Sequence, residues 1–568
     1  MIDEREQDRL PERLADFQTL WEGLDYAARS EAGLRFYSSR GEMEQALSYR
    51  DLHVRASATA RRLGSLGYPR GSRVGLIAAT GPDFLAAFYG CQYAGLVPCP
   101  LPHTVYMGGR EAYKARIAAL LRAADASLAL ATGDLLSLVQ EAGRLGWSGH
   151  ALSYGALAER PDIGDLAPFA PDEDAYIQFS SGSTASPKGV RIGQRAILAN
   201  TRAILTEAMR LTPADRSFSW LPFYHDMGLV GFSIAPMLGQ CPVDYLATSS
   251  FARRPALWLK LMSDNATTIT YAPGFGYELA VRRLGSDETA IDLSHLRIAG
   301  VGGDMIRADS LKAFAAALAT SGFSEKAFLP SYGMAEATLA ISFARSEGEI
   351  PVDRVDRSAL EGSHRAVPAS GPEARLFTIC GKPLDGHDIV IVDRAGSPVA
   401  DRVIGRILVR GPSLMTGYVA DAQAGTPAIG PDGFFDTGDL GYRFDGDLVV
   451  TGRAKDLILH NGRNIWPQDV EWAIEQLPGL RPGSVAAFAV ETADGRDELT
   501  VLVECSLAAA LERSGRRRDV ATAIASSQGV AAHVVLVRPG SLPFTSSGKL
   551  SRAGAKALYL SGNLVGLD

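Results

Sequence analysis

The chain is 568 residues long and carries 57 Lys and Arg against 64 Asp and Glu, which gives a net charge of −7. This mildly acidic balance gives no electrostatic basis for nucleic-acid binding, and 46% hydrophobic with 21% charged residues excludes a disordered chain. Five scattered cysteines, with no closely spaced pair, argue against a disulfide framework or a thiolate zinc site.

The first residues, MIDEREQDRLPERL, are charged and lack an apolar core, so we expect no secretory signal and a cytoplasmic protein. The longest uncharged stretch, residues 84–109, contains Pro98, Pro100 and Pro102. Prolines interrupt a membrane helix, so this stretch is interpreted as a buried helix followed by a buried strand.

Apolar strand-like runs alternate with helical patterns through the first two thirds of the chain, which predicts an α/β fold. The first cycle consists of a strand at 73–79, a helix at 82–93 and a strand at 96–99. Further strands are predicted at 176–179, 268–271, 297–301 and 327–330. Their continuous apolar character is typical of strands covered on both faces.

The last part of the chain has a different organisation. Residues 346–372 are polar and are predicted to form a long loop or insertion. A domain boundary is predicted near 452–455, which gives an N-terminal domain of 1–452 and a C-terminal domain of 453–568. The second domain is predicted to contain strands at 457–459, 485–490 and 499–504 and a helix at 467–477 that begins with proline.

The most informative motif is FSSGSTASPKGV at 179–190, directly after a predicted strand. Small residues let backbone N–H groups approach an anion, hydroxyls add donors, and a lysine adds charge. This composition predicts a phosphate-binding loop without the Walker A spacing, although such a segment alone is more often an ordinary turn. The candidate ligands are Ser180, Ser181, Gly182, Ser183, Thr184 and Lys188.

Two further motifs carry groups suited to a nucleotide. In WLPFYHDMGL at 220–229, His225 could position a substrate group, and the alternative is a packed histidine. In SYGMAEA at 331–337, Tyr332 offers a flat face for a purine and Glu336 a hard oxygen ligand for Mg²⁺. The alternative there is a turn with a surface carboxylate. GVGGD at 300–304 predicts a tight turn that a base could approach.

The last motifs lie near the predicted domain boundary and the C-terminus. In FFDTGDLGY at 434–442, Asp439 could accept from both hydroxyls of a ribose, and Arg453 of GRAKD adds a donor. In LPFTSSGKLSR at 542–552, Lys549 could close over an active site. Standing alone, this lysine would be interpreted as a solvated residue of the tail.

Together, in this order, these motifs resemble the adenylate-forming superfamily of acyl-CoA synthetases, fatty acyl-AMP ligases, luciferases and peptide-synthetase adenylation domains. The resemblance covers nearly the whole chain and implies a large α/β domain, a small mobile α+β domain and an active site between them. It is strongest to fatty acyl-AMP ligases and acyl-carrier-protein synthetases, in LPFYHDMGL, FARRPALWL, YGMAEATLA, CGKPL and NGRNIWPQDVE. The long spacing between Glu336 and Gly381 resembles the insertion of those ligases, which is thought to hinder the use of free CoA.

The resemblance implies a role for each matching residue. Lys549 would contact the carboxylate and the α-phosphate, His225 would border the acyl carboxylate, Glu336 would hold Mg²⁺ and Lys455 would be the hinge. Besides the phosphate loop, the ATP site would comprise Gly303, Asp304, Ser331, Tyr332, Gly333, Met334, Asp439 and Arg453. The acyl tunnel would be lined by Tyr224, Met227, Gly228, Gly274, Phe275 and Tyr277.

Some positions depart from the family pattern. Ala185 and Gly274 stand where glycine and asparagine are usual, Ala335 replaces a frequent threonine, and Gly-Gly-Asp at 302–304 replaces Gly-Ala-Glu-Pro. The implied reaction is ATP- and Mg²⁺-dependent activation of a fatty acid to an acyl-adenylate, followed by transfer to the phosphopantetheine thiol of an acyl carrier protein. The alternatives are a fatty acyl-CoA ligase and a non-catalytic acyl- or nucleotide-binding module.

Overall fold

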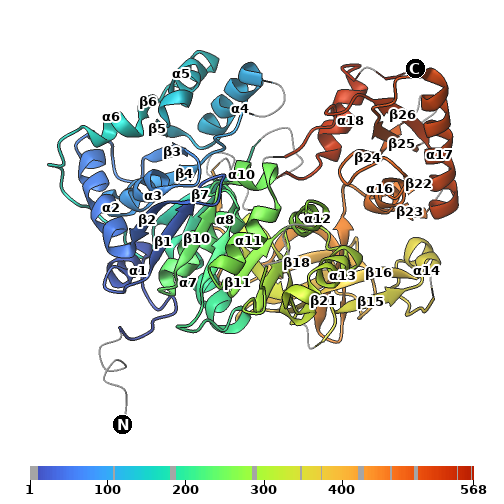
Figure 1. Cartoon of the computed structure of the whole chain (residues 1–568), viewed down its shortest axis with the longest axis horizontal. Coiled ribbons are helices and arrows are strands. Elements are labelled where there is room, and N and C mark those ends of the chain that lie inside the picture. Colours follow the sequence, from blue (N-terminus) through green and yellow to red (C-terminus); the bar gives the residue numbers. More distant parts are fainter. Residues whose placement is uncertain are drawn as a thin grey trace, which may run out of the picture.

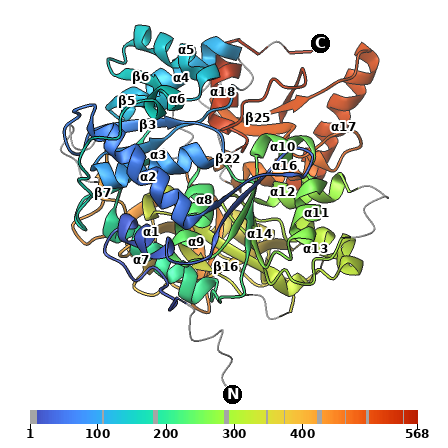
Figure 2. The ribbon, with the colours of Figure 1, turned by 60° about the vertical axis from the view of Figure 1, so that its left-hand side comes forward.

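The computed structural model describes residues 10–105, 109–179, 187–284, 291–345, 348–371, 374–419, 428–460, 463–491, 497–545, 548–564 and 566–567. A large N-terminal part and a smaller C-terminal part lie side by side in Figure 1, and the turned view of Figure 2 shows the same division. Strands and helices alternate along the chain, so the predicted α/β class is confirmed.

A 14-stranded sheet forms the centre of the large part, in the order β17-β18-β20-β21-β16-β14-β13-β12-β11-β9-β10-β1-β2, with β15 beside β16. The strands from β13 to β1 are parallel, and those from β13 to β17 are antiparallel. The bounds are β1 Gly33–Tyr37, β2 Met43–Ser48, β9 Ser217–Ser219, β10 Val243–Leu246, β11 Ile269–Ala272, β12 Ile298–Val301, β13 Phe328–Gly333, β14 Ala340–Phe343, β15 Val352–Val355, β16 Arg375–Pro383, β17 Asp388–Val392, β18 Gly405–Arg410, β20 Phe435–Phe444 and β21 Asp447–Arg453.

A second, parallel sheet has the order β4-β3-β5-β6 and contains the first predicted cycle. Its strands are β3 Arg73–Ile77, β4 Val97–Pro100, β5 Ala126–Ala131 and β6 His150–Ser153. The helix between β3 and β4 is α3 (Pro82–Ala94), which begins with proline and ends at Gly95, whose φ is 65°. Proline is preorganised for a first helical position and glycine readily takes the left-handed conformation, so the sequence fixes both ends of α3.

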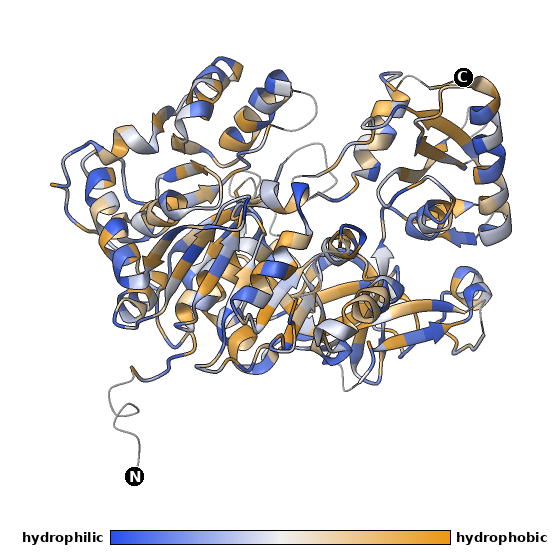
Figure 3. Ribbon diagram, in the orientation of Figure 1, coloured by the Kyte–Doolittle hydropathy of each residue, from blue (hydrophilic) through white to orange (hydrophobic). Residues whose placement is uncertain are grey.

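Helices cover the sheets, and a three-stranded sheet of β7, β8 and β19 lies beside the site described below. Figure 3 shows hydrophobic residues concentrated on the strands, whereas the surrounding helices carry both hydrophobic and hydrophilic residues. These remaining elements are α1 Leu20–Ala27, α2 Tyr49–Gly64, α4 Gly109–Ala123, α5 Gly133–Ala142, α6 Tyr154–Ala158, β7 Asp174–Phe179, β8 Gly189–Gly193, α7 Gln194–Ala203, α8 Asp226–Leu229, α9 Ala235–Leu238, α10 Thr248–Arg253, α11 Ala256–Asp264, α12 Gly274–Arg282, α13 Ala308–Ala317 and β19 Gly417–Tyr418.

The C-terminal part has its own core around β24 (Val485–Glu491), β25 (Asp497–Glu504) and β26 (His533–Val537). Alternate residues of β24 point to opposite faces, because side chains alternate along a strand. Val485 and Ala487 belong to one hydrophobic cluster, and Ala486 and Phe488 belong to another. The first face packs against α16 (Pro467–Glu475) and α17 (Ala510–Gln528), and the second against α18 (Arg552–Leu560). A short hairpin of β22 (Ile458–His460) and β23 (Arg463–Ile465) precedes α16.

The polar segment at 346–372 is not the long loop that its composition predicts. Its described residues include the strand β15, which pairs with β16, and the helix α14 (Arg357–Ser363). The first turn of α14 is capped by Asp356, which accepts from the Ala359 N–H at 2.7 Å. Polar side chains here are buried against one another: Asp353 accepts from Arg402 and from the Tyr442 hydroxyl. Composition indicated a loop because it does not reveal these internal partners, and the other interpretation, an insertion, stays a prediction.

Candidate active site

Two adjoining cavities of about 410 Å³ and 180 Å³ lie where the C-terminal ends of the parallel strands meet the C-terminal part of the chain. The first is large enough for a small-molecule site. Predicted site residues line one or both cavities: Lys188, His225, Met227, Gly303, Asp304, Ser331, Tyr332, Gly333, Met334, Glu336, Asp439, Arg453, Lys455 and Lys549. The predicted phosphate ligands from Ser180 to Thr184, and Ala185, lie outside the described residues.

Asp439 is the buried carboxylate of the smaller cavity. It faces Arg453 across the β20–β21 ladder, with Nε–Oδ1 at 3.5 Å, and accepts from the Tyr332 hydroxyl at 2.7 Å. Burial raises the pKa of Asp439, and this effect outweighs the opposing influence of Arg453, Tyr332 and Lys549. A partly compensated buried carboxylate is suited to accept hydrogen bonds from ligand hydroxyls.

Glu336 lies in a 3₁₀ turn directly after β13 and accepts from the Tyr418 hydroxyl at 2.9 Å. Burial raises its pKa, since hydrogen bonds compensate only part of the lost hydration. Lys188 lies over the Tyr418 ring, with Nζ 4.8 Å from the ring centroid. The described residues contain no cluster of three or more His, Cys, Asp or Glu that could hold a metal. Glu336 thus fits Mg²⁺ only as one ligand, with phosphate and water oxygens supplying the others, which is usual for this ion.

His225 and Asp226 form a close pair at the start of α8, with Nδ1–Oδ1 at 2.6 Å. Burial acts to raise the pKa of Asp226, but His225 and Lys549 lower it overall. The loop before α8 is held by Gln178, whose Nε2 donates to the Tyr224 carbonyl at 2.9 Å. The pair therefore presents a fixed polar edge to the large cavity.

Lys549 belongs to both cavities and brings the C-terminal part into the site. Its charge contributes to the lowered pKa of Asp226 and opposes the rise that burial causes in the pKa of Asp439. Gly303 has φ +80°, and a Cβ there would lie 3.6 Å from Lys549 Nζ and 3.0 Å from the Met227 methyl group. Glycine at this position thus allows the turn and leaves room for the Met227 methyl group, whereas a Cβ would make only an ordinary contact with Lys549.

Lys455 also lines the large cavity, and burial followed by repulsion from Arg453 lowers its pKa. Its hinge role and the domain boundary near it stay predictions. The positions of β21, which ends at Arg453, and β22, which begins at Ile458, are compatible with a connection there.

The large cavity has a second, apolar arm that sequence reasoning placed elsewhere. Of the predicted tunnel residues, Met227 alone lines either cavity in the described part of the chain. Gly228 packs against Pro222, where a Cβ would lie 2.2 Å from the carbonyl oxygen. Tyr277 is fully buried, donates to the Gly300 carbonyl at 2.8 Å and packs among aromatic rings of the core.

The other three predicted tunnel residues are also not among the residues that line the described cavities. Phe275 contacts Trp220 edge to face, Tyr224 contacts His103, and Gly274 opens onto free space. The arm is instead lined by residues from two π-helical turns, Ile204–Ala208 and Val230–Ile234, and from strands. Its apolar lining comprises Ile204, Leu205, Met209, Leu211, Phe232, Ala235, Pro236, Ile269, Leu339, Ala340 and Phe343. A π turn has no recognisable sequence period, so the sequence carried no signal for this wall.

Ion pairs join the two parts of the chain beside the site. Arg375 of β16 and Asp469 of α16 lie 2.9 Å apart, and each side chain is less than a tenth exposed. The Arg375 guanidinium also stacks on Phe377 and Trp466, with ring-centroid distances of 4.3 and 4.5 Å. Burial lowers the pKa of Arg375 and raises that of Asp469. Breaking such a buried pair leaves an uncompensated charge, so the pair favours this arrangement of the two parts.

Glu475 of α16 gives the interface a pH dependence. It lies 3.6 Å from Arg307, and burial raises its pKa to about 7. The pKa of Glu475 is higher in the folded protein than in the unfolded chain. As the pH rises from about 4.5 to 7, ionisation of Glu475 therefore lowers the free energy of unfolding. Above about pH 7 the loss is complete and stays constant. We expect Glu475→Gln to stabilise the protein by about 1–3 kcal/mol at alkaline pH and by much less near pH 5.

Calorimetry of Glu475→Gln at both pH values tests this expectation. Glu512→Gln, an exposed position in the first turn of α17, is the control and should leave the Tm unchanged at both pH values. A Glu475→Gln variant that is less stable than the wild type at alkaline pH would show that the ion pair with Arg307 outweighs burial.

No helix in the described ranges is long and apolar enough to cross a membrane.

Two family models match most of the chain. Residues 25–419 match the family model described as AMP-binding enzyme, and residues 462–554 match that of the AMP-binding enzyme C-terminal domain. A putative acyl-CoA synthetase of Caulobacter vibrioides is 46% identical over 556 residues, covering 97% of this chain and 96% of its own. A medium-chain-fatty-acid–[acyl-carrier-protein] ligase of Moorena producens is 33% identical, with coverage of 97% and 96%.

The chain is also similar to solved structures of fatty acyl-adenylate ligases. A structure from a study of fatty acyl-adenylate ligases of E. coli and L. pneumophila is 43% identical with a TM-score of 0.92, covering 97% of this chain and 100% of that one. An L. pneumophila fatty acyl-adenylate ligase in complex with acyl adenylate and pyrophosphate is 25% identical with a TM-score of 0.73, and 96% of each chain is covered.

Proposed function

Because the chain belongs to the AMP-binding enzyme family of adenylate-forming ligases, we propose that it activates a fatty acid with ATP and passes the acyl group to the phosphopantetheine thiol of an acyl carrier protein. The observation that carries this proposal is the continuous large cavity. One end holds Lys549, His225 and Glu336, and the other is an apolar arm. A fatty acid has this same division between a charged head and an apolar chain.

In the first step, a carboxylate oxygen forms a bond to the α-phosphorus of ATP, and the bond from that phosphorus to the bridging oxygen breaks. The products are the acyl-adenylate and pyrophosphate. Lys549 stabilises the charge that develops on the α-phosphate, and Asp439 with Arg453 holds the ribose. Mg²⁺, bound by Glu336 and phosphate oxygens, would neutralise phosphate charge.

In the second step, a thiol attacks the acyl carbon of the adenylate, forming a thioester and releasing AMP. An external thiol is required because all five cysteines of the chain are buried. Burial also raises the pKa of Cys241, the cysteine that lines the cavity, to about 12, which disfavours its thiolate.

Five free thiols also suit the reducing cytoplasm, where we place the protein.

Contacts of α14 with the C-terminal part support a carrier protein over free CoA as the acceptor. Glu361 accepts from Arg463 at 2.5 Å, and its backbone carbonyl accepts from Asn464 at 3.3 Å. Arg357 donates to the backbone carbonyl of Ser527. These contacts restrain the C-terminal part from the side of the predicted insertion. The second candidate, a fatty acyl-CoA ligase, is favoured by the printed description of the Caulobacter relative.

The acceptor is tested by incubating the enzyme with ATP, Mg²⁺ and a fatty acid, with no acceptor, with CoA or with a phosphopantetheinylated carrier protein. We expect acyl-carrier product and little acyl-CoA from the wild type. Arg357→Ala combined with Glu361→Ala removes the side-chain contacts of α14 with the C-terminal part and so weakens the restraint. We expect acyl-CoA formation to rise by roughly ten-fold, which corresponds to about 1.4 kcal/mol.

The control is Asp388→Ala, which breaks an exposed ion pair with Arg410 far from α14 along the sheet order and should change neither product. Efficient acyl-CoA formation by the wild type would favour the CoA ligase. Stabilisation by ATP without any release of pyrophosphate would favour the binding module.

A further inference from the structure

The apolar arm of the large cavity follows the parallel strands of the central sheet. Both Tyr271 and Ile269 of β11 line the cavity, and Ile269 is the first residue of that strand. Ser217, the first residue of β9, also lines the cavity and lies opposite Ile269 in the ladder. The arm therefore extends from the C-terminal ends of the strands, where Glu336 lies, to their N-terminal ends.

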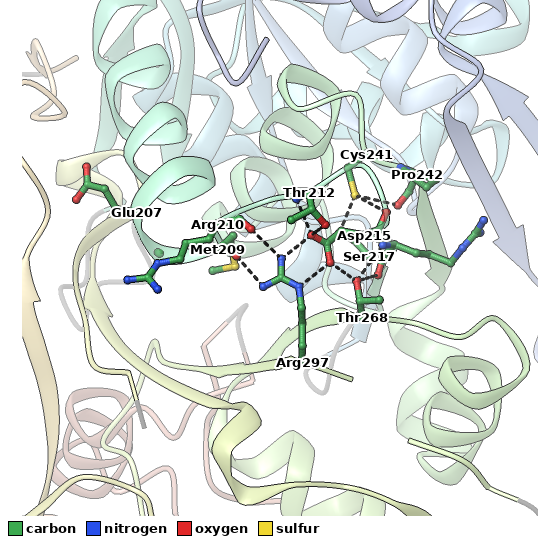
Figure 4. Close-up of polar contacts among 12 residues, drawn as sticks. Glu207, Met209, Arg210, Thr212, Asp215, Ser217, Cys241, Pro242, Thr268 and Arg297 are labelled. Carbon is green, nitrogen blue, oxygen red and sulfur yellow. Dashed lines mark hydrogen bonds and ion pairs between the residues drawn. The ribbon is translucent and has the colours of Figure 1, made fainter. Parts of the chain in front are cut away.

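At the N-terminal ends of the strands lies a group of four residues that we call the distal stop. Met209 and Leu211 line the arm, and Asp215 and Arg297, which do not, come just before β9 and β12. Arg297 Nε and Nη2 donate to the two carboxylate oxygens of Asp215 at 2.7 and 2.5 Å. The Asp215 carboxylate also accepts from the Thr268 hydroxyl at 2.7 Å, and it is almost completely buried. Figure 4 shows Arg297 pointing to Asp215, with Ser217 and Cys241, two further residues of the cavity wall, on the other side.

The same arginine holds the backbone of the wall. Arg297 Nη1 donates to the Met209 carbonyl at 2.8 Å, and Nη2 donates to the Arg210 carbonyl at 3.3 Å. Arg210 has a φ of +44°, which is uncommon for a residue other than glycine. Met209 and Leu211, on either side of it, both line the cavity. The ion pair thus fixes a strained backbone segment that places two apolar side chains across the end of the arm.

We propose that the distal stop sets the longest acyl chain that the enzyme accepts. The proposal rests on the proposed function, because it assigns the apolar arm to the fatty acyl chain. Asp215 and Arg297 are positioning residues, which act through Met209 and Leu211. A longer chain would have to displace these side chains and break a bidentate pair with a buried carboxylate. Breaking this pair costs several times the free energy that is gained by burying one further methylene group.

The test measures kcat and KM for fatty acids from hexanoic to octadecanoic acid by acid-dependent release of pyrophosphate. For the wild type, kcat/KM should rise by roughly four-fold per methylene until the chain reaches the stop and then fall. In Arg297→Ala the fall should move to a chain longer by at least two carbons, with a gain of roughly ten-fold for the first acid beyond the wild-type limit. The gain should appear in KM, while kcat for hexanoic acid stays unchanged.

A second variant and a control keep the proposal testable if Arg297→Ala folds poorly. Ile269→Ala leaves the ion pair intact and shortens a side chain beside the stop, so it should also move the limit to longer acids. Arg35→Ala removes a geometrically matched pair, with Nε–Oδ1 at 2.6 Å and Nη2–Oδ2 at 2.8 Å to the buried Asp244, which does not line the described cavity. It should leave the limit unchanged.

The outcomes separate this inference from the proposed function. A wild type that activates no fatty acid would remove both. An active wild type with the same limit in Arg297→Ala and Ile269→Ala would overturn the distal stop alone. A shift of the limit in Arg35→Ala would also overturn it, because the effect would then follow from lost stability and not from position.

Discussion

Replacing Lys549 with alanine is expected to lower the rate of pyrophosphate release from ATP and a fatty acid by about 10²–10³-fold. Lys549 lines both cavities, and its charge influences the carboxylates of Asp226 and Asp439 on either side. A cation fixed at this point stabilises charge that grows on the α-phosphate in the transition state, and the loss of one preorganised donor has an effect of this size.

The Lys549→Ala experiment needs a readout for each half-reaction. Acyl transfer from a supplied acyl-adenylate should change less, because the reacting atom in that step is the acyl carbon and the α-phosphate is only part of the leaving group. Lys556→Ala, in α18 of the same part of the chain and outside both described cavities, is the control and should adenylate at the wild-type rate. Adenylation at the wild-type rate by Lys549→Ala itself would show that this lysine has no role in the first step.

Replacing Asp439 with asparagine is expected to raise the KM for ATP by roughly 10–100-fold. This is the effect expected when hydrogen bonds from ligand hydroxyls to a charged acceptor are lost. Asparagine keeps the size of the side chain and can still accept from the Tyr332 hydroxyl, so the change isolates the charge. Because burial raises the pKa of Asp439, its ionised form is lost at a higher pH than for an ordinary aspartate. The wild-type KM for ATP should therefore rise as the pH falls, and the variant should show a weaker dependence.

Asp388→Asn is the control for this measurement, since Asp388 is an exposed strand residue that pairs with Arg410. Its KM for ATP should equal that of the wild type. An Asp439→Asn variant with an unchanged KM for ATP would mean that this carboxylate does not bind the nucleotide.

The polar end of the site could be predicted from the sequence because its residues lie in short motifs at the ends of strands. Ser331 and Tyr332 lie at the end of β13, and Glu336 is the third residue after that strand. Asp439 and Arg453 face each other across one hairpin. Parallel strands bring their C-terminal ends to one edge of a sheet, so local motifs converge without further information. Predicted strand positions in the first two thirds of the chain also agree with the structure to within a few residues.

The apolar arm and the interface could not be predicted in this way. The arm depends on two π-helical turns and on the first residues of strands, whose register no local pattern reveals. The resemblance implied a tunnel role for Tyr277, but its hydroxyl donates to the backbone of β12 inside the core. The pair of Arg375 and Asp469 joins residues far apart in the chain, and only the tertiary structure brings them together.

The central claim is that the cavity joins an acyl carboxylate to the α-phosphate of ATP. The most direct test is mass spectrometry of the products from enzyme, ATP, Mg²⁺ and a fatty acid, without any thiol acceptor. We predict acyl-adenylate and pyrophosphate in equal amounts, formed only when the acid is present. ATP consumption that does not depend on the acid, or the absence of any acyl-adenylate across the range of fatty acids, would contradict this account.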